Sequence, residues 1–132
     1  DDALGWSALM GLENVQATGD GLVARTITRD PAIQSEWLEQ NAADWRALEV
    51  TLQITPAPQP DTVLAVFWET ERAPIHSQAN VAVRLQADTG EHVYRLDLGK
   101  HSRWRGLVRR LRVDPCQAPG HTVRIRRMRL LP

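Results

Sequence analysis

The sequence has very little cysteine and no long apolar stretch. Its 132 residues include one cysteine, Cys116, so no disulfide bond can form within the chain. It has no apolar run of the roughly 18 residues that a membrane span needs, and no transmembrane segment is expected. The chain opens on Asp1 rather than Met, and we expect residues 1–132 to be one domain excised from a longer protein.

The motifs that usually mark an active site are missing as well. The sequence contains no G-x-S-x-G, no P-loop and no G-x-G-x-x-G. Two pairs of acidic residues lie close in sequence without a recognisable acid/base arrangement, namely Glu69 with Glu71 and Asp88 with Glu91. We therefore predict a domain that is not an enzyme.

Metal-ligand patterns are equally scarce. The four histidines are scattered, with no H-x-x-x-H spacing and no Cys/His cluster, which argues against a transition-metal site. A structural calcium ion would need clustered loop oxygens, and Asp30, Asp88 and Asp114 are candidates by residue type alone. The prediction is accordingly no cofactor and no metal.

Charge is balanced in total but unevenly distributed. Residues 1–99 hold six arginines and fifteen acidic residues, whereas residues 100–132 hold ten basic residues and one acidic residue, Asp114. The basic strands could pair with acidic strands inside the fold. Alternatively, they could form a surface for an anionic glycan, a phosphate or a neighbouring domain. Nucleic acid is not an expected partner, because the domain is not basic in total and shows no aromatic-basic interleaving.

Alternation of apolar and polar residues, which is typical of β-strands, recurs along the chain. The central example is residues 107–114, which Pro115 ends. One face of this expected strand holds Leu107, Arg109, Leu111 and Val113. The other face holds Val108, Arg110, Arg112 and Asp114. Further strands are expected at residues 13–17, 22–28, 46–54, 63–70, 81–86, 92–99 and 122–131, the last with a β-bulge or a crossing between sheets at Arg126-Arg127. The pattern predicts an antiparallel β-sandwich of jelly-roll type with eight or nine strands and little helix.

Residues 32–45 allow two interpretations. Ile33, Trp37, Asn41 and Trp45 lie four apart, as on one face of a helix, but Asn41 interrupts the apolar stripe. We predict an extended segment around Trp37-Leu38 and a turn at residues 41–44, with a helical turn as the alternative.

Five tryptophans against one phenylalanine and one tyrosine is an unusual balance. The indole face is large and rigid, and it is suited to stacking on a sugar ring. We expect Trp6, Trp45 and Trp104 to fill the core beside strand ends, and we leave Trp37 undecided. Trp68 is the predicted sugar-stacking residue, with a core position as its alternative.

Polar residues on the middle strands form a second candidate feature. They could line one face of one sheet: Glu49, Thr51, Gln53, Arg84, Gln86, Arg95 and Asp97. Such a face offers carboxylates, amides and guanidinium groups that can make paired hydrogen bonds to sugar hydroxyls. The predicted sugar site is therefore Trp68 with Glu49, Arg84, Gln86, Arg95 and Asp97. The alternative is an ordinary solvated face with cross-strand ion pairs.

A set of segments spread over almost the whole chain carries one family resemblance: Trp6, the Thr28-Arg29-Asp30-Pro31 stop, residues 66–70, residues 92–98, Trp104-Arg105-Gly106, residues 111–115 and the terminal Val-x-Ile…Leu strand. These segments resemble bacterial jelly-roll modules similar to carbohydrate-binding modules. Such modules are found beside glycosyltransferases of cell-surface polysaccharide synthesis.

The resemblance implies a non-catalytic module that binds a bacterial polysaccharide or oligosaccharide, of O-antigen or capsule type. It would hold the glycan near a catalytic domain of the same polypeptide, in the cytoplasm or at the cytoplasmic face of the inner membrane. The alternative is an interaction domain of a glycosyltransferase that binds no glycan. It would dock through its basic C-terminal strands, with Arg109, Arg110 and Arg127 as the docking surface.

Overall fold

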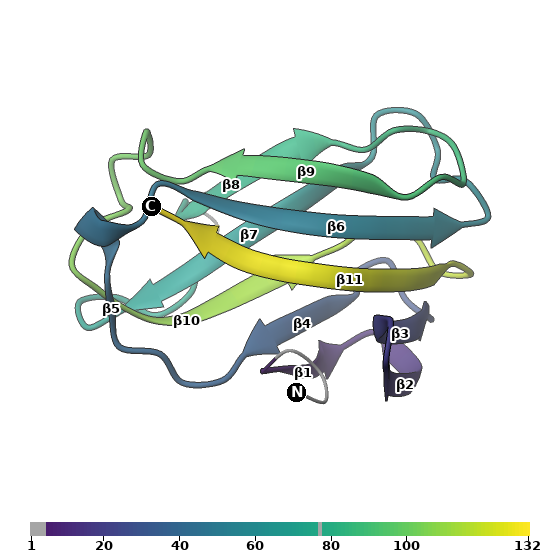
Figure 1. The fold of residues 1–132 in the computed structure, drawn as a ribbon, viewed down its shortest axis with the longest axis horizontal. Coiled ribbons are helices and arrows are strands. Elements are labelled where there is room, and N and C mark those ends of the chain that lie inside the picture. Colours follow the sequence, from purple (N-terminus) through teal and green to yellow (C-terminus); the bar gives the residue numbers. More distant parts are fainter. Residues whose placement is uncertain (1–4, 77) are drawn as a thin grey trace.

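The computed structural model describes residues 5–76 and 78–132, which form a sandwich of two antiparallel β-sheets (Figure 1). Sheet A has the order β1-β4-β10-β7-β8, with β5 paired to the start of β10. Its strands are β1 (Trp6–Met10), β4 (Ala32–Ser35), β5 (Gln40–Asn41), β7 (Val63–Thr70), β8 (Asn80–Arg84) and β10 (Leu107–Asp114). Sheet B has the order β2-β3-β11-β6-β9. Its strands are β2 (Leu12–Thr18), β3 (Gly21–Thr26), β6 (Ala47–Thr55), β9 (His92–Asp97) and β11 (Thr122–Leu131).

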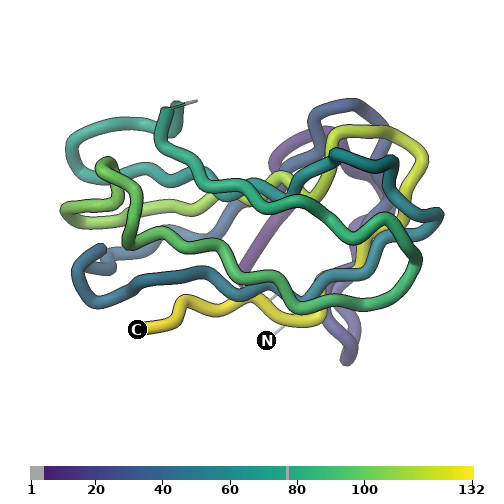
Figure 2. Tube along the Cα trace, turned by 90° about the horizontal axis from the view of Figure 1, so that it is seen from above, coloured from purple at the N-terminus to yellow at the C-terminus, as the bar shows by residue number. Residues whose placement is uncertain are grey.

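The predicted all-β sandwich with little helix is confirmed, with eleven strands in the described residues instead of the eight or nine expected. In Figure 1, β6, β9 and β11 lie in front of β7, β8 and β10, and Figure 2 shows the two layers from above. Alternate residues of facing strands fill the space between them, such as Leu48, Val50 and Leu52 of β6. Each fully buried aliphatic side chain of this kind stabilises the fold by roughly 1.5–3 kcal/mol.

The predicted change of parity in the last strand is a β-bulge. The register of β11 against β6 shifts between Ile125 and Arg127. The shift keeps Ile125 and then Met128 on the inner side, opposite Leu52 and Val50 of β6. β11 therefore stays within sheet B along its whole length, and the alternative of a crossing between sheets is wrong.

A second bulge, in β10, was not predicted. Its register against β7 shifts between Val108 and Arg110. Val108 and Leu111 are both buried, so the extra residue places the side chains of Arg109 and Arg110 on the same, outer side of sheet A. Strict alternation had put these two arginines on opposite faces.

Residues 32–45 form β4, β5 and a 3₁₀ turn, η1 (Ala42–Asp44), so the alternative of a helical turn holds for residues 42–44 alone and no helical face joins Ile33, Trp37 and Trp45. Ile33 pairs with Val113 of β10 and faces the core. The predicted turn is confirmed: Asn41 Oδ1 accepts a hydrogen bond from the Ala43 backbone N–H at 3.1 Å. The segment between β4 and β5 has no regular structure and carries Trp37 at the surface.

Two buried tryptophans close one end of the sandwich. The rings of Trp68 and Trp104 meet edge to face, 5.2 Å apart. The Trp104 Nε1–H donates to the carbonyl oxygens of Ala42 (3.0 Å) and Trp45 (2.9 Å), which ties residues 99–106 to η1. The core positions expected for Trp6 and Trp104 are confirmed, and Trp45 packs half-buried against the same core.

Candidate functional site

The structure overturns the role predicted for Trp68. Its side chain faces the core from β7, and the residue is 2% exposed. Its Nε1–H donates to the Arg103 carbonyl oxygen at 3.0 Å, and its ring meets that of His101 edge-on at 5.0 Å. No face of this indole reaches solvent, so the prediction that Trp68 stacks on a sugar is wrong.

The other predicted residues do not form one face. Glu49, Arg95 and Asp97 share the outer face of sheet B, where Glu49 lies opposite Arg95 on the neighbouring strand. Arg84 belongs to sheet A and lies 3.4 Å from Asp61. Gln86 lies in the loop between the sheets, where its backbone N–H donates to the Tyr94 hydroxyl. The predicted common surface is therefore wrong for Arg84 and Gln86.

The polar groups that remain together on sheet B are paired with one another. Arg129 Nε lies 3.0 Å from Glu49 Oε1, and Arg95 Nε lies 2.9 Å from Asp97 Oδ1. Arg95 and Asp97 also line a hollow of about 140 Å³ with Arg46. In the described part of sheet B the only aromatic residues are His92 and Tyr94, and Tyr94 is buried. This face thus matches the alternative of a solvated surface with cross-strand ion pairs.

The outer face of sheet A, termed face A, has a different composition. One row of cross-strand neighbours runs across five strands: Ser7, Gln34, Arg112, Phe67 and Asn80. The row brings together a hydroxyl, two amides, a guanidinium group and an aromatic ring. Glu69 and Arg110 lie opposite each other farther along β7 and β10. Face A therefore combines hydrogen-bonding groups with aromatic surface.

The most prominent side chain on this side is Trp37, which is 51% exposed. The guanidinium carbons of Arg109 and Arg110 lie 5.6 Å and 5.4 Å from its ring centroid. The backbone N–H of Leu38 donates to the Arg109 carbonyl oxygen at 2.7 Å, which fixes this segment beside the bulge of β10. The Nε atoms of both arginines are buried without a hydrogen-bond partner among the described residues, so the indole contact holds these groups.

Sequence reasoning left Trp37 undecided, although one signal was present. Trp37 lies in a polar run between Glu36 and Glu39, unlike the tryptophans beside apolar strands. An isolated indole in such a run is more consistent with a surface position than with a core position. The bulge places Arg109 and Arg110 under the ring. No pattern in the sequence indicated this bulge.

Arg112, at the centre of the row, is held by two carboxylates. Its Nε donates to Asp114 Oδ1 at 2.8 Å, and its Nη2 donates to Asp30 Oδ1 at 3.2 Å. Burial raises the pKa of the Asp114 carboxyl, although Arg112 acts against this shift. The hydrogen bond to Asp114 in turn raises the pKa of Arg112. A second hydrogen bond, from Arg112 Nη2 to Asp114 Oδ2 at 3.0 Å, makes this pair bidentate.

The calcium candidates do not converge. Asp30 and Asp114 share Arg112, whereas Asp88 accepts a hydrogen bond from His92 at 2.6 Å. That hydrogen bond, together with one from the Gly90 backbone N–H, lowers the pKa of Asp88. Within residues 5–76 and 78–132 no three His, Cys, Asp or Glu side chains gather as a metal-binding group would require.

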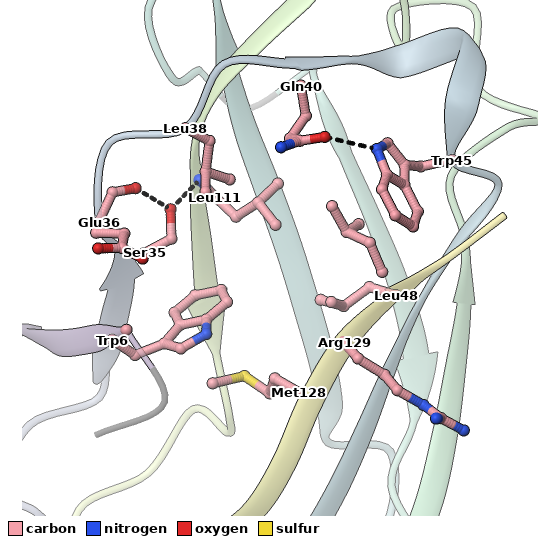
Figure 3. Close-up of a pocket in the computed structure, with 12 residues that line it drawn as sticks. Trp6, Ser35, Glu36, Leu38, Gln40, Trp45, Leu48, Leu111, Met128 and Arg129 are labelled. Carbon is pink, nitrogen blue, oxygen red and sulfur yellow. Dashed lines mark hydrogen bonds between the residues drawn. The ribbon is translucent and has the colours of Figure 1, made fainter. Parts of the chain in front are cut away.

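A pocket of about 240 Å³ opens between the sheets, and Figure 3 shows Trp6, Leu111 and Met128 on its walls. Its polar groups already bind one another. The Ser35 hydroxyl donates to the Glu36 carbonyl and accepts from the Leu111 N–H, and Gln40 Oε1 accepts from the Trp45 indole N–H. The Ser35 hydroxyl and Gln40 Oε1 of this edge pocket are therefore already engaged within the protein.

The predicted docking surface is also divided. Arg109 and Arg110 lie on face A, but Arg127 pairs with Thr51 on the outer face of sheet B. The three arginines therefore point to opposite sides of the sandwich, and the prediction that they form one surface is wrong. No helix in the described part of the chain has the length and apolar character that a membrane span requires.

The architecture is that of carbohydrate-binding modules. A xylan-binding module of family 15 superposes with a TM-score of 0.66 at 13% identity, covering 97% of this chain and 90% of that one. A family 28 module specific for non-crystalline cellulose gives 0.66 at 7% identity, covering 97% and 87%. A family 11 module of a cellulosomal cellulase from Clostridium thermocellum gives 0.64 at 7% identity, covering 98% and 91%. At these identities the likeness establishes the fold.

Two sequence-based comparisons gave no further relatives. No protein-family model matches the chain. No curated protein matches it either.

Proposed function

We propose that this chain is a non-catalytic carbohydrate-binding module whose face A holds a polysaccharide. The observation that carries the proposal is the half-exposed indole of Trp37, held by Arg109 and Arg110 at one end of a polar face. An indole presents a rigid apolar surface to the C–H groups of a sugar ring. The groups of the row offer hydrogen bonds to its hydroxyls.

The fold supports a carbohydrate-binding role for the chain. The structural neighbours are modules that bind xylan and non-crystalline cellulose. We extend the binding of a polysaccharide, though neither polymer in particular, to this chain. Because face A is an open sheet surface, it buries little of each sugar, and we expect weak affinity for a single site, with a Kd near 1 mM (about 4 kcal/mol).

The proposal has a finer part that rests on the sequence resemblance. The ligand is a bacterial surface polysaccharide of O-antigen or capsule type, which the module holds while an enzyme makes or modifies it. The enzyme is a catalytic domain of the same polypeptide, a glycosyltransferase, located in the cytoplasm or at the cytoplasmic face of the inner membrane. Holding the glycan raises its effective concentration at that domain, and no bond chemistry occurs in the module itself.

Titration of the protein with a panel of polysaccharides, followed by NMR, tests the proposal. Shifts of the Trp37 indole N–H and of the side-chain amide of Gln34 are expected. Trp37→Ala should weaken binding at least about tenfold, which equals about 1.4 kcal/mol, while the protein stays folded with a melting temperature lowered by only a few degrees through the lost contacts to Arg109 and Arg110. Val93→Ala is the control, because Val93 is 64% exposed on the outer face of sheet B. Equal affinity in the wild type and Trp37→Ala would remove face A as the site.

A further inference from the structure

Three arginines meet in one hollow at the end of the β7–β10 pair. The hollow has a volume of about 420 Å³ and is lined by Thr70, Arg72, Ala73, Ser102, Arg103 and Arg105. Three of the six lining residues are cationic, two carry hydroxyl groups, and none carries a carboxylate. We call these six residues the arginine pocket.

The carboxylate of Glu71, next to Thr70 and Arg72 in sequence, contacts the start of β10. One of its oxygens accepts a hydrogen bond from the backbone N–H of Leu107 at the start of β10. The other lies over Gly106, where a Cβ atom would come within 2.4 Å of it. Glycine with φ +85° therefore makes room for this carboxylate at the start of β10. Among the described residues its one ion pair is with Arg72 of the arginine pocket, at 3.6 Å.

The other two arginines have no carboxylate partner among the described residues. Arg103 donates to Gln78 Oε1 at 2.7 Å and lies 3.4 Å from a ring nitrogen of His76. The Nε of Arg105 donates to the Ser102 carbonyl oxygen at 2.9 Å. These contacts orient both guanidinium groups without neutralising their charge.

The charge distribution of the chain points in the same direction. Of the ten basic residues between 100 and 132, three are paired with acidic residues in the described structure: Arg112, Arg126 and Arg129. Internal pairing therefore accounts for a minority of this basic segment. Arg103 and Arg105 belong to the unpaired majority, and they share their pocket with Arg72.

We infer that the polysaccharide bound by this module is anionic, and that the arginine pocket receives its carboxylate or sulfate groups. This inference rests on the proposed function. Guanidinium groups match the paired oxygens of such anions, and the hydroxyls of Thr70 and Ser102 supply further donors. The pocket lies at the end of β7, where its residue Thr70 is three positions, or about 10 Å along the strand, from Phe67 of face A. An extended glycan that follows β7 from face A would reach the pocket.

The test compares polymers that share a backbone and differ in charge. Polygalacturonate and its methyl-esterified form are titrated against the wild-type protein and against Arg103→Gln/Arg105→Gln. We expect the wild type to bind polygalacturonate at least tenfold more tightly than the ester, and the double variant to lose that preference while keeping its affinity for the ester. Dextran against dextran sulfate forms the second arm and separates sulfate from carboxylate recognition.

Arg124→Gln/Arg127→Gln is the matched control, since it removes the same charge from the outer face of sheet B. A control that loses the preference as fully as the pocket variant would overturn the inference in favour of general charge attraction. Binding of the neutral polymers with no preference for the charged ones would overturn the inference and leave the proposed function standing. Binding of none of the four polymers would count against both.

Discussion

The guanidinium carbon of Arg112 lies 5.3 Å from the ring centroid of Phe67, directly across the β10–β7 pair. Phe67 thereby packs against a cation that Asp114 and Asp30 hold from the other side. The contact joins the aromatic part of face A to its ion-pair cluster. The central residues of the row are consequently oriented before any ligand arrives, which lowers the entropy cost of binding.

This contact predicts a measurable coupling between the two side chains. A double-mutant cycle with Phe67→Leu and Arg112→Met should give a coupling energy of about 0.5–1 kcal/mol in the free energy of unfolding. Urea denaturation of the wild type and the three variants supplies the numbers. Additive effects of the two substitutions would show that the ring and the guanidinium group do not stabilise each other.

The contact between Arg112 and Asp114 also predicts that the free energy of unfolding of an Arg112→Met variant depends on pH. Its removal in Arg112→Met leaves the Asp114 carboxylate, whose side chain is 11% exposed, without its main partner. We expect a loss of about 2–4 kcal/mol at pH 7, measured by urea denaturation. Burial already raises the pKa of Asp114, and without the cation this pKa rises further. A carboxyl with a raised folded-state pKa costs stability above that pKa and none below the unfolded-state pKa, so the loss should shrink as the pH falls from 7 towards 4.

The control for this prediction is Arg112→Met/Asp114→Asn, which removes the titrating group. The double variant should show a smaller loss that hardly changes between pH 7 and pH 4. An equal loss at both pH values in the single variant would mean that packing, rather than the uncompensated charge, accounts for it.

How well each strand could be predicted from the sequence depends on how its side chains are buried. β6 has one apolar face and one mixed face, so alternation located it. β4 was missed as a strand because its four residues are too few to establish an alternation, although Ala32 and Ile33 are buried. β1 was missed because it lies at the edge of sheet A and leaves Leu9 and Met10 exposed. A strand with little to bury leaves a weak periodic signal.

The sequence predicted the residues of the candidate site much less well, for two physical reasons. Parity says which residues share a face of one strand, but it does not say to which sheet the strand belongs, and this separated Arg84 from Arg95. In addition, β7 is apolar on both parities, so the sequence could not tell whether Trp68 or Phe67 points outward. The bulge of β10 added a register change that alternation does not reveal.

Gly21 predicts a backbone constraint between β3 and β11. Its φ is +110°, and a Cβ atom there would lie 2.1 Å from the Ile125 carbonyl oxygen, next to the bulge of β11. Gly21→Ala should therefore destabilise the fold by about 2–4 kcal/mol, measured by thermal or urea denaturation. Gly19→Ala is the control, because a Cβ atom at Gly19 would have nothing within 4 Å, and it should change stability by less than about 0.5 kcal/mol. Equal effects of the two substitutions would contradict the close approach at Gly21.

Cys116 predicts slow thiol chemistry in the folded protein. The residue is 1% exposed, and burial raises the pKa of its thiol. A thiol that is both buried and protonated reacts only when the surrounding structure opens. Labelling with a disulfide reagent at pH 8 should therefore be at least about 100-fold slower in buffer than in 6 M guanidinium chloride. Cys116→Ser should show no labelling in either solvent, which separates the thiol from background reaction. Rapid labelling of the native protein would mean that the loop between β10 and β11 opens far more often than its burial indicates.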